Sequence, residues 1–293
     1  MLLVLARLLL ERLALLGAVA AGTFAAAGFT ELARYLLGLL TSAREWSAPK
    51  SPPPVTWAEI IKRNVPLVDR LNPQERARLD TLIRVFLDDV RFEGCEGLEL
   101  TEEIRVTIAA QACLLLVNLR FPWYPKLRRV LVYPDTFVPR SVPLATHERE
   151  QEPLLGEAWS DGSVVLSWRS ARRGALNPFD GHNVVLHEFA HVLDSGSGAM
   201  DGVPPLEKSD LATWAYVLHR HYARLLRFAR KDRPASLDHY GAASKAEFFA
   251  VATETFFEKP QVLKRQEPEL YDALCKVYRQ DTAATQVLRY GAV

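Results

Sequence analysis

Two histidines and a glutamate stand close together in the apolar stretch NVVLHEFAHVLD, residues 183–194. The run is too long and too uniformly apolar for a half-buried strand, and the Ser-Gly-Ser-Gly sequence that follows supplies a stop, so we predict a buried helix. On a helix, His187 and His191 project from one face with roughly 6 Å between their imidazoles, which suits two ligands of one zinc ion. Glu188 points about 100° away, where it can accept a proton from a water molecule at the metal. The alternative is a cluster of buried polar groups that satisfy one another by hydrogen bonds.

A catalytic zinc ion needs a third protein ligand. The longer pattern HExxHxxGxxH fails, because Asp194 and Ser197 stand where its glycine and third histidine would be. The downstream candidates are His219, His221, Asp238, His239, Glu247 and Glu254. The two glutamates stand out because they lie among aromatic residues of a predicted helix. Spacing does not choose between them, since Glu247 also fits a capping box with Ser244 and Glu254 lies two turns further along the same face.

The other polar residues around the motif have alternative roles. Asp194 shares the face of the two histidines, where it could accept a hydrogen bond from one of them; a position at the exposed end of the helix fits equally well. We expect His182 to belong to the region before the helix cap. We expect His219 and His221 to be surface residues, since side chains two positions apart on a helix face different directions.

Composition describes an ordinary globular protein of 293 residues, 49% hydrophobic and 24% charged. The 36 basic and 35 acidic residues leave a net charge of +1, so we expect no direct binding to nucleic acid. The three cysteines are isolated in the sequence and form neither a disulfide framework nor a thiolate metal site. This usage favours a reducing compartment, and we predict a cytoplasmic protein.

The beginning of the chain differs in composition from the rest. Residues 1–40 are unusually apolar, and 13–29 contain no charge, although this window is just short of the roughly 20 residues that a spanning helix needs. A packed or peripheral helix, a membrane anchor and a cleaved signal all fit, so membrane contact through 1–40, as a tether to the inner membrane, is one expectation. A Pro-rich linker follows at 41–56, and we place a single metallopeptidase domain at 57–293.

Apolar periodicity within the domain predicts mostly helices around a small mixed sheet, an α+β fold. The predicted helices, apart from the motif helix, are 72–90, 101–119, 211–231, 244–259 and 268–280, and the predicted strands are 128–134 and 163–168. Asn72 and Thr101 are the expected caps of the first two helices. The strand at 163–168 directly precedes the motif helix along the chain, so we expect it to offer an edge along which a peptide can pair.

Several ordered motifs together resemble the Mlc titration factor A family of bacterial zinc-dependent peptidases. They are RFEGCEGLELTEEIRVTIAAQACLLL, GEAW with VVLSW, GHNVVLHEFAHVLD and YGAASKAEFFAVATETFF. The similarity extends from about Trp57 to the segment LYDALCKVYRQD, which is most of the chain.

The resemblance implies a zincin-like metallopeptidase domain, similar to the catalytic domain of anthrax lethal factor, with the HExxH motif on a buried helix. It implies that His187, His191 and Glu247 bind one Zn²⁺ ion per chain. Glu188 would be the general base, and Tyr240, upstream of Glu247, would stabilise the oxyanion.

The same resemblance implies an aminopeptidase-like enzyme that acts on small peptides. The namesake of the family also binds the glucose repressor Mlc, so a transcriptional repressor of sugar uptake is an expected partner. The alternative is a non-catalytic protein that sequesters the repressor. The glutamate of the motif favours the enzyme, because a purely structural zinc ion needs four protein ligands and no base.

Overall fold

The computed structural model describes residues 54–119, 124, 126–135, 156–158, 162–197 and 200–284. All of them belong to one compact unit, Ser51–Val293. The predicted apolar segment 1–40 and most of the predicted linker 41–56 lie outside the described residues, so this division of the chain stays a prediction.

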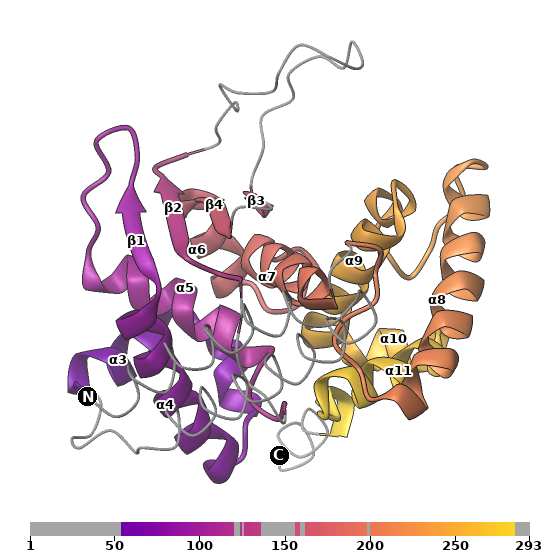
Figure 1. Cartoon of the computed structure of the whole chain (residues 1–293), viewed down its shortest axis with the longest axis horizontal. Helices are drawn as coiled ribbons and strands as arrows, with labels where there is room; N and C mark the ends of the chain where they lie inside the picture. The colour runs from indigo at the N-terminus through magenta and orange to yellow at the C-terminus, as the bar shows by residue number, and fades with distance from the viewer. Residues whose placement is uncertain are drawn as a thin grey trace, which may run out of the picture. The chain divides into compact units, whose positions relative to one another are not determined.

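Helices dominate the described part (Figure 1). The α-helices are α3 (Val55–Asn64), α4 (Pro73–Asp89), α5 (Glu102–Leu114), α6 (Trp168–Leu176), α7 (Val184–Asp194), α8 (Lys208–Ala229), α9 (Lys245–Glu258), α10 (Pro260–Gln266) and α11 (Pro268–Tyr278). The strands are β1 (Arg91–Gly94), β2 (Arg129–Tyr133), β3 (Gly156–Ala158) and β4 (Ser163–Ser167), and the short 3₁₀ helices are η1 (Pro66–Arg70), η2 (Ser195–Ser197) and η3 (His239–Ala242). The prediction of a mostly helical protein with a small sheet is confirmed.

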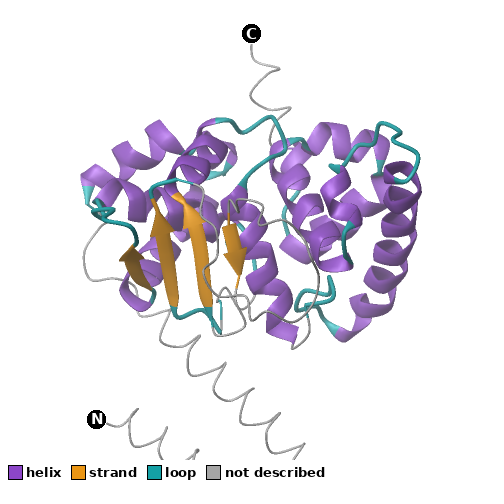
Figure 2. Cartoon of the chain, turned by 90° about the horizontal axis from the view of Figure 1, so that it is seen from above, coloured by secondary structure: helices purple, strands orange, loops and turns teal. Residues whose placement is uncertain are grey.

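The sheet has four strands in the order β1-β2-β4-β3 (Figure 2). The first three are parallel, and β3 runs antiparallel to β4, so the sheet is mixed as predicted. β4 pairs with β2 on one side and with β3 on the other, and it is buried along its whole length. The predicted edge at 163–168 is therefore wrong, because β3 occupies the position at which a peptide would have to pair.

Local sequence signals set where the helices begin. The Asn72 side chain accepts hydrogen bonds from the amides of the first turn of α4, and the Glu75 side chain accepts one from the Asn72 amide, which completes a capping box. Thr101 caps α5 by accepting from the Ile104 amide. Both predicted caps are confirmed. α5 ends at Leu114, earlier than predicted, and the short elements α3, α6, α10, β1 and β3 were not predicted.

Helix α7 lies in the middle of the unit, against α5, β3 and β4 on one side and α9 on the other (Figure 1). Its Phe189 is fully buried, with its ring centroid 5.7 Å from that of Phe86 and 5.0 Å from that of Tyr124. On the far side of α9, Phe256 packs against Tyr278. The motif helix and α9 are thus packed within one apolar core.

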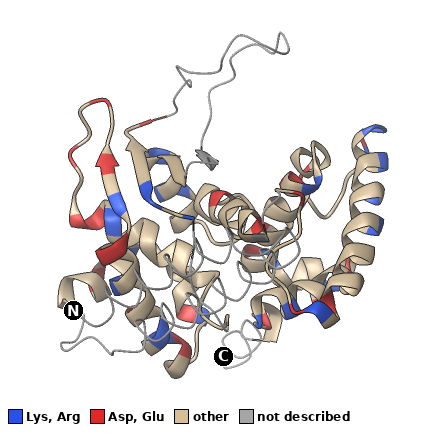
Figure 3. Cartoon of the chain, viewed as in Figure 1, with Lys and Arg blue, Asp and Glu red and all other residues tan. Residues whose placement is uncertain are grey.

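Helix α8 carries Lys and Arg residues at intervals along its length (Figure 3). Two of them join α8 to the beginning of α11, because Arg220 pairs with Glu269 at 2.6 Å and Arg224 pairs with Glu267 at 3.0 Å. These ion pairs join α8 to the beginning of α11.

The prediction of a membrane tether is corrected, because the structure gives it no support. Within the part of the chain that the structure describes, no helix is both long enough and apolar enough to cross a membrane. The longest helix there, α8, has 22 residues but carries charged side chains along its length, and charges are costly in hydrocarbon. Residues 1–40, where the tether was placed, lie outside the described residues.

Candidate metal centre

Helix α7 presents His187 and His191 on one face, as its spacing predicts. The Asn183 side chain caps the helix by accepting from the Leu186 amide at 3.1 Å. The two imidazole rings lie with their centroids 4.9 Å apart, and the two Nε2 atoms are 3.2 Å apart. Both side chains are largely buried, so the pair forms a small polar site among the apolar residues of the packed helices.

Glu247, in the first turn of α9, completes the cluster. Its Oε2 lies 2.9 Å from His187 Nε2 and 3.4 Å from His191 Nε2. Ser244 caps α9 by accepting from the Glu247 amide, but the Glu247 carboxylate turns toward the histidines and takes part in the cluster instead of a capping box. His187, His191 and Glu247 each offer one ligand atom within 4.8 Å of the others, and this group could hold a metal ion. Two imidazole nitrogens and one carboxylate oxygen are a donor set that suits zinc.

Glu254, the rival candidate, meets the other side of the same imidazole. Its Oε1 lies 2.8 Å from His187 Nδ1, while Nε2 of that ring faces Glu247. Glu254 is therefore outside the three-residue cluster. A carboxylate on the second nitrogen of a ligand histidine fixes the orientation and tautomer of the ring. In the sequence, Asp194 was the candidate for this role.

Asp194 takes neither of the two roles that the sequence allowed, a hydrogen-bond partner of a histidine or an exposed residue at the helix end. Its side chain is fully buried and accepts hydrogen bonds from the amides of Gly202 and Val203, each at 2.8 Å. Burial raises the pKa of Asp194, against the effect of these two hydrogen bonds. Asp194 thus anchors the segment that follows α7 and orients neither histidine.

The charges of the cluster reinforce one another. Burial alone would lower the pKa of His187, but its hydrogen bonds with Glu247 and Glu254 outweigh burial and raise the pKa to about 10. Burial alone would raise the pKa of Glu247, but hydrogen bonds with His187 and His191 lower it to about 2. The protonated ring of His187 therefore lies between two carboxylates. Their negative charge would also stabilise a metal cation.

Glu188 lies beside the cluster but outside it. The side chain is 5% exposed, and burial raises the pKa of Glu188 to about 7, although the nearby His187 and His191 act in the opposite direction. A carboxyl group with a pKa near 7 exchanges a proton readily at neutral pH.

Tyr240 lies at the rim of the cluster. It belongs to η3, which Asp238 caps by accepting from the Tyr240 amide at 2.7 Å. The ring is 57% exposed, and its centroid lies 5.9 Å from that of His187. The residues predicted as ligands, base and oxyanion stabiliser are therefore neighbours.

Comparison with known proteins agrees with this arrangement. The family model of the glucose-regulated metallo-peptidase M90 matches residues 40–279. The chain belongs to the M90 metallopeptidase family. Membership implies a metal ion, and the resemblance predicted from the motifs is confirmed.

Two relatives of this M90 member span most of its length. A Synechocystis protein described as uncharacterized protein slr2042 is 40% identical over 240 residues, which cover 80% of this chain and 87% of the relative. The Mlc titration factor A of Yersinia pestis is 33% identical over 241 residues, which cover 78% of this chain and 85% of the relative. The match to the family model, residues 40–279, includes the whole metal centre.

The remaining histidine candidates do not belong to the three-residue cluster of the M90 domain. His219 is exposed on α8, and His239 Nε2 contacts the Arg233 carbonyl at 2.9 Å. His182 Nε2 lies 3.9 Å from Asp238 Oδ2 near the surface. His221 corrects a prediction, because it is buried, with Nδ1 2.9 Å from a carboxylate oxygen of Glu267. That partner comes from the residue before α11, so no local pattern indicated it.

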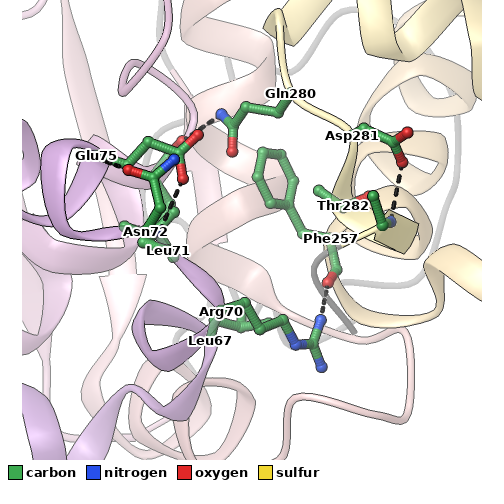
Figure 4. A pocket seen from close by; sticks show the side chains of 11 residues that line it. Leu67, Arg70, Leu71, Asn72, Glu75, Phe257, Gln280, Asp281 and Thr282 are labelled. Atoms are coloured by element: carbon green, nitrogen blue, oxygen red, sulfur yellow. Dashed lines mark hydrogen bonds between the residues drawn. The ribbon is translucent and has the colours of Figure 1, made fainter. Parts of the chain in front are cut away.

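A hollow of about 290 Å³ lies elsewhere in the M90 domain, between η1, the start of α4 and the segment after α11 (Figure 4). Its polar groups already have partners. Arg70 donates to the carbonyls of Phe257 and Pro178, and Gln280 donates to the Leu114 carbonyl at 3.0 Å. No residue of the metal centre lines it, so the hollow does not replace the cluster as the candidate site.

Proposed function

We propose that the protein is a zinc-dependent peptidase of the zincin type, with the HExxH motif of α7 as its active centre. The observation that carries the proposal is the cluster of His187, His191 and Glu247 with the buried Glu188 beside it. A structural zinc site would have four protein ligands and would need no base. This cluster has three candidate ligands and an adjacent carboxyl group with a pKa near 7.

His187, His191 and Glu247 would hold the metal at the junction of α7 and α9. Zinc, when bound, polarises the scissile carbonyl and makes water more acidic. The chain supplies the rest. Glu254 keeps Nε2 of His187 directed at the metal position, and Glu188 takes the proton of the attacking water and passes it to the leaving amine.

Tyr240 stabilises the negative charge that develops on the carbonyl oxygen. Its exposed position beside His187 lets the hydroxyl reach a substrate that lies over the cluster. A hydrogen-bond donor directed at a developing oxyanion is among the stronger catalytic contributions that one side chain makes.

The substrate is a peptide that pairs with β3. This strand is last in the order of the described sheet, and α7 packs beside it. An extended peptide can add to such an edge by backbone hydrogen bonds. β3 thereby takes the role that the sequence suggested for β4. By resemblance to the family, we propose an aminopeptidase-like preference for small peptides.

The decisive experiment replaces the proposed base. Glu188→Gln should retain zinc, measured by elemental analysis, and lose hydrolysis of aminoacyl anilides by at least about 10²-fold. Glu269→Gln is the matched control, because Glu269 pairs with Arg220 on the surface and should leave both properties unchanged. Hydrolysis by Glu188→Gln at the wild-type rate would refute the mechanism.

The name of the Yersinia relatives supports a second function. A titration factor for Mlc is by name a protein that binds that repressor, and we propose a similar repressor partner for this chain. The alternative of a purely sequestering protein is tested with the same variant. Purified Mlc should bind wild type and Glu188→Gln equally, because binding needs no chemistry. If neither binds, the partner is not a repressor of this kind.

A further inference from the structure

A third glutamate of α9 is buried without being part of the metal centre. Glu247, Glu254 and Glu258 follow one another at spacings of seven and four residues, so they share one helical face. Glu258 is only 1% exposed, and burial raises its pKa to about 8 in spite of its hydrogen bonds. Buried carboxyl groups destabilise a fold unless their partners compensate, so the partners of Glu258 indicate its role.

Both oxygens of Glu258 contact the segment that leads into α7. Oε2 accepts from the Gly181 amide at 2.9 Å, and Oε1 accepts from Asn183 Nδ2 at 3.1 Å. Gly181 has φ +77°, a conformation that favours glycine and turns the chain just ahead of the helix. Glu258 therefore holds the turn and the helix cap together.

Asn183 connects Glu258 to His187, the first of the three proposed ligands. Its Oδ1 accepts from the Leu186 amide, and its backbone carbonyl accepts the amide of His187 at 2.9 Å, in the first turn of α7. Its own amide donates to Glu254, which also holds the His187 ring. Glu254 thus holds the imidazole of His187 directly, and both glutamates hold its backbone through Asn183.

We propose that Glu258 is a positioning residue of the metal centre, which places His187 by holding Asn183 and the turn at Gly181. It touches neither the ligands nor the substrate. The inference rests on the proposed zinc site and adds to it a residue that the ligand motif does not contain. The affinity for zinc depends on such supporting contacts, and their loss typically costs about 10- to 100-fold.

The chemistry of the contact allows an exchange experiment. In Glu258→Gln the introduced amide nitrogen cannot accept, so one of the two donors loses its partner. In Asn183→Asp the introduced carboxylate still caps α7 but faces the Glu258 carboxyl. In the double variant the introduced amide donates to the introduced carboxylate, and its oxygen accepts from Gly181. The pair of hydrogen bonds is restored with donor and acceptor exchanged.

Zinc affinity of the full chain, measured by competition with a chelator, is the readout. We expect each single variant to bind zinc about 10- to 100-fold more weakly and the double variant to return to within about threefold of wild type. Thr253→Val is the control for stability alone. Thr253 is equally buried in α9 but bonds Tyr278, away from α7, so its loss should lower the stability of the metal-free protein and leave zinc affinity unchanged.

The outcomes separate the inference from the proposed function. Zinc binding by wild type that is absent or not saturable refutes the proposed site. Wild-type binding with undiminished affinity in both single variants refutes the positioning role. If the single variants do not fold, the double variant decides: wild-type affinity supports the exchange, and an unfolded or weakly binding double variant overturns it.

Discussion

Zinc has to displace a proton from His187, and this makes zinc affinity depend on pH. Glu247 and Glu254 outweigh the effect of burial and raise the pKa of this imidazole to about 10, so the ring is charged at pH 7. A metal ligand must be deprotonated. Deprotonating a group about three units below its pKa costs about 4 kcal/mol, or roughly 10³-fold in apparent affinity at pH 7.

The direction of the pH dependence follows from the same competition between the proton and the zinc ion. His187 is protonated below a pH of about 10, so raising the pH removes the competing proton and strengthens binding. We expect the apparent dissociation constant for zinc to fall about tenfold per pH unit between about pH 6.5 and 8.5, after correction for protonation of the competing chelator.

Isothermal titration calorimetry tests the proton directly. Binding heats at pH 7, compared between two buffers of different ionisation enthalpy, should report about one proton released per zinc ion. The Glu188→Gln variant is the protein to use, because Glu188 itself has a pKa near 7 and would add to the count. In a further Glu254→Gln background the rise in affinity should end at a lower pH, since one of the carboxylates that raise the pKa of His187 is gone. Affinity that does not change with pH, with no proton released, would refute the reasoning.

Substitutions at three further positions test separate parts of the structure. Tyr240→Phe should lower kcat about 10²- to 10³-fold with zinc content unchanged, because the substitution removes the hydroxyl and keeps the ring beside His187; kcat near wild type would remove Tyr240 from the mechanism. Phe189→Ala should cost about 3 to 5 kcal/mol in urea unfolding of the metal-free protein, since its ring packs on Phe86 and Tyr124; a loss under about 1 kcal/mol would contradict that packing. Asn72→Ala should cost about 1 kcal/mol through the lost cap, and Asn72→Asp, which keeps an acceptor, should cost less.

The helical parts of the site were predictable because they depend on residues three or four positions apart. His187 and His191 share a face on any α-helix, and a cap such as Asn72 bonds amides two and three residues further on. The strands of the sheet centre were predictable for a similar reason, since β2 and β4 are short apolar runs between turn residues. The very short β1 and β3 carry too few residues to show a pattern.

Strand order was not predictable from order along the chain. β3 precedes β4 in sequence but pairs outside it, which leaves β4 without a free edge. His221 shows the same limit for a single residue, since its helix gives no sign of the carboxylate that Glu267 brings to it. The first correction concerns a strand of only three residues that lies just before β4 in sequence. The second concerns a contact between residues that are 46 positions apart.

The sequence by itself determined a buried helix with two histidines on one face, a glutamate beside them and the family to which they belong. It could not separate Glu247 from Glu254, because both lie on one helical face and both are surrounded by apolar residues. Only the packing of α9 against α7 decided this. Two turns of helix separate the two carboxylates by about 10 Å, so they reach opposite nitrogens of His187, and Glu247 alone joins His191.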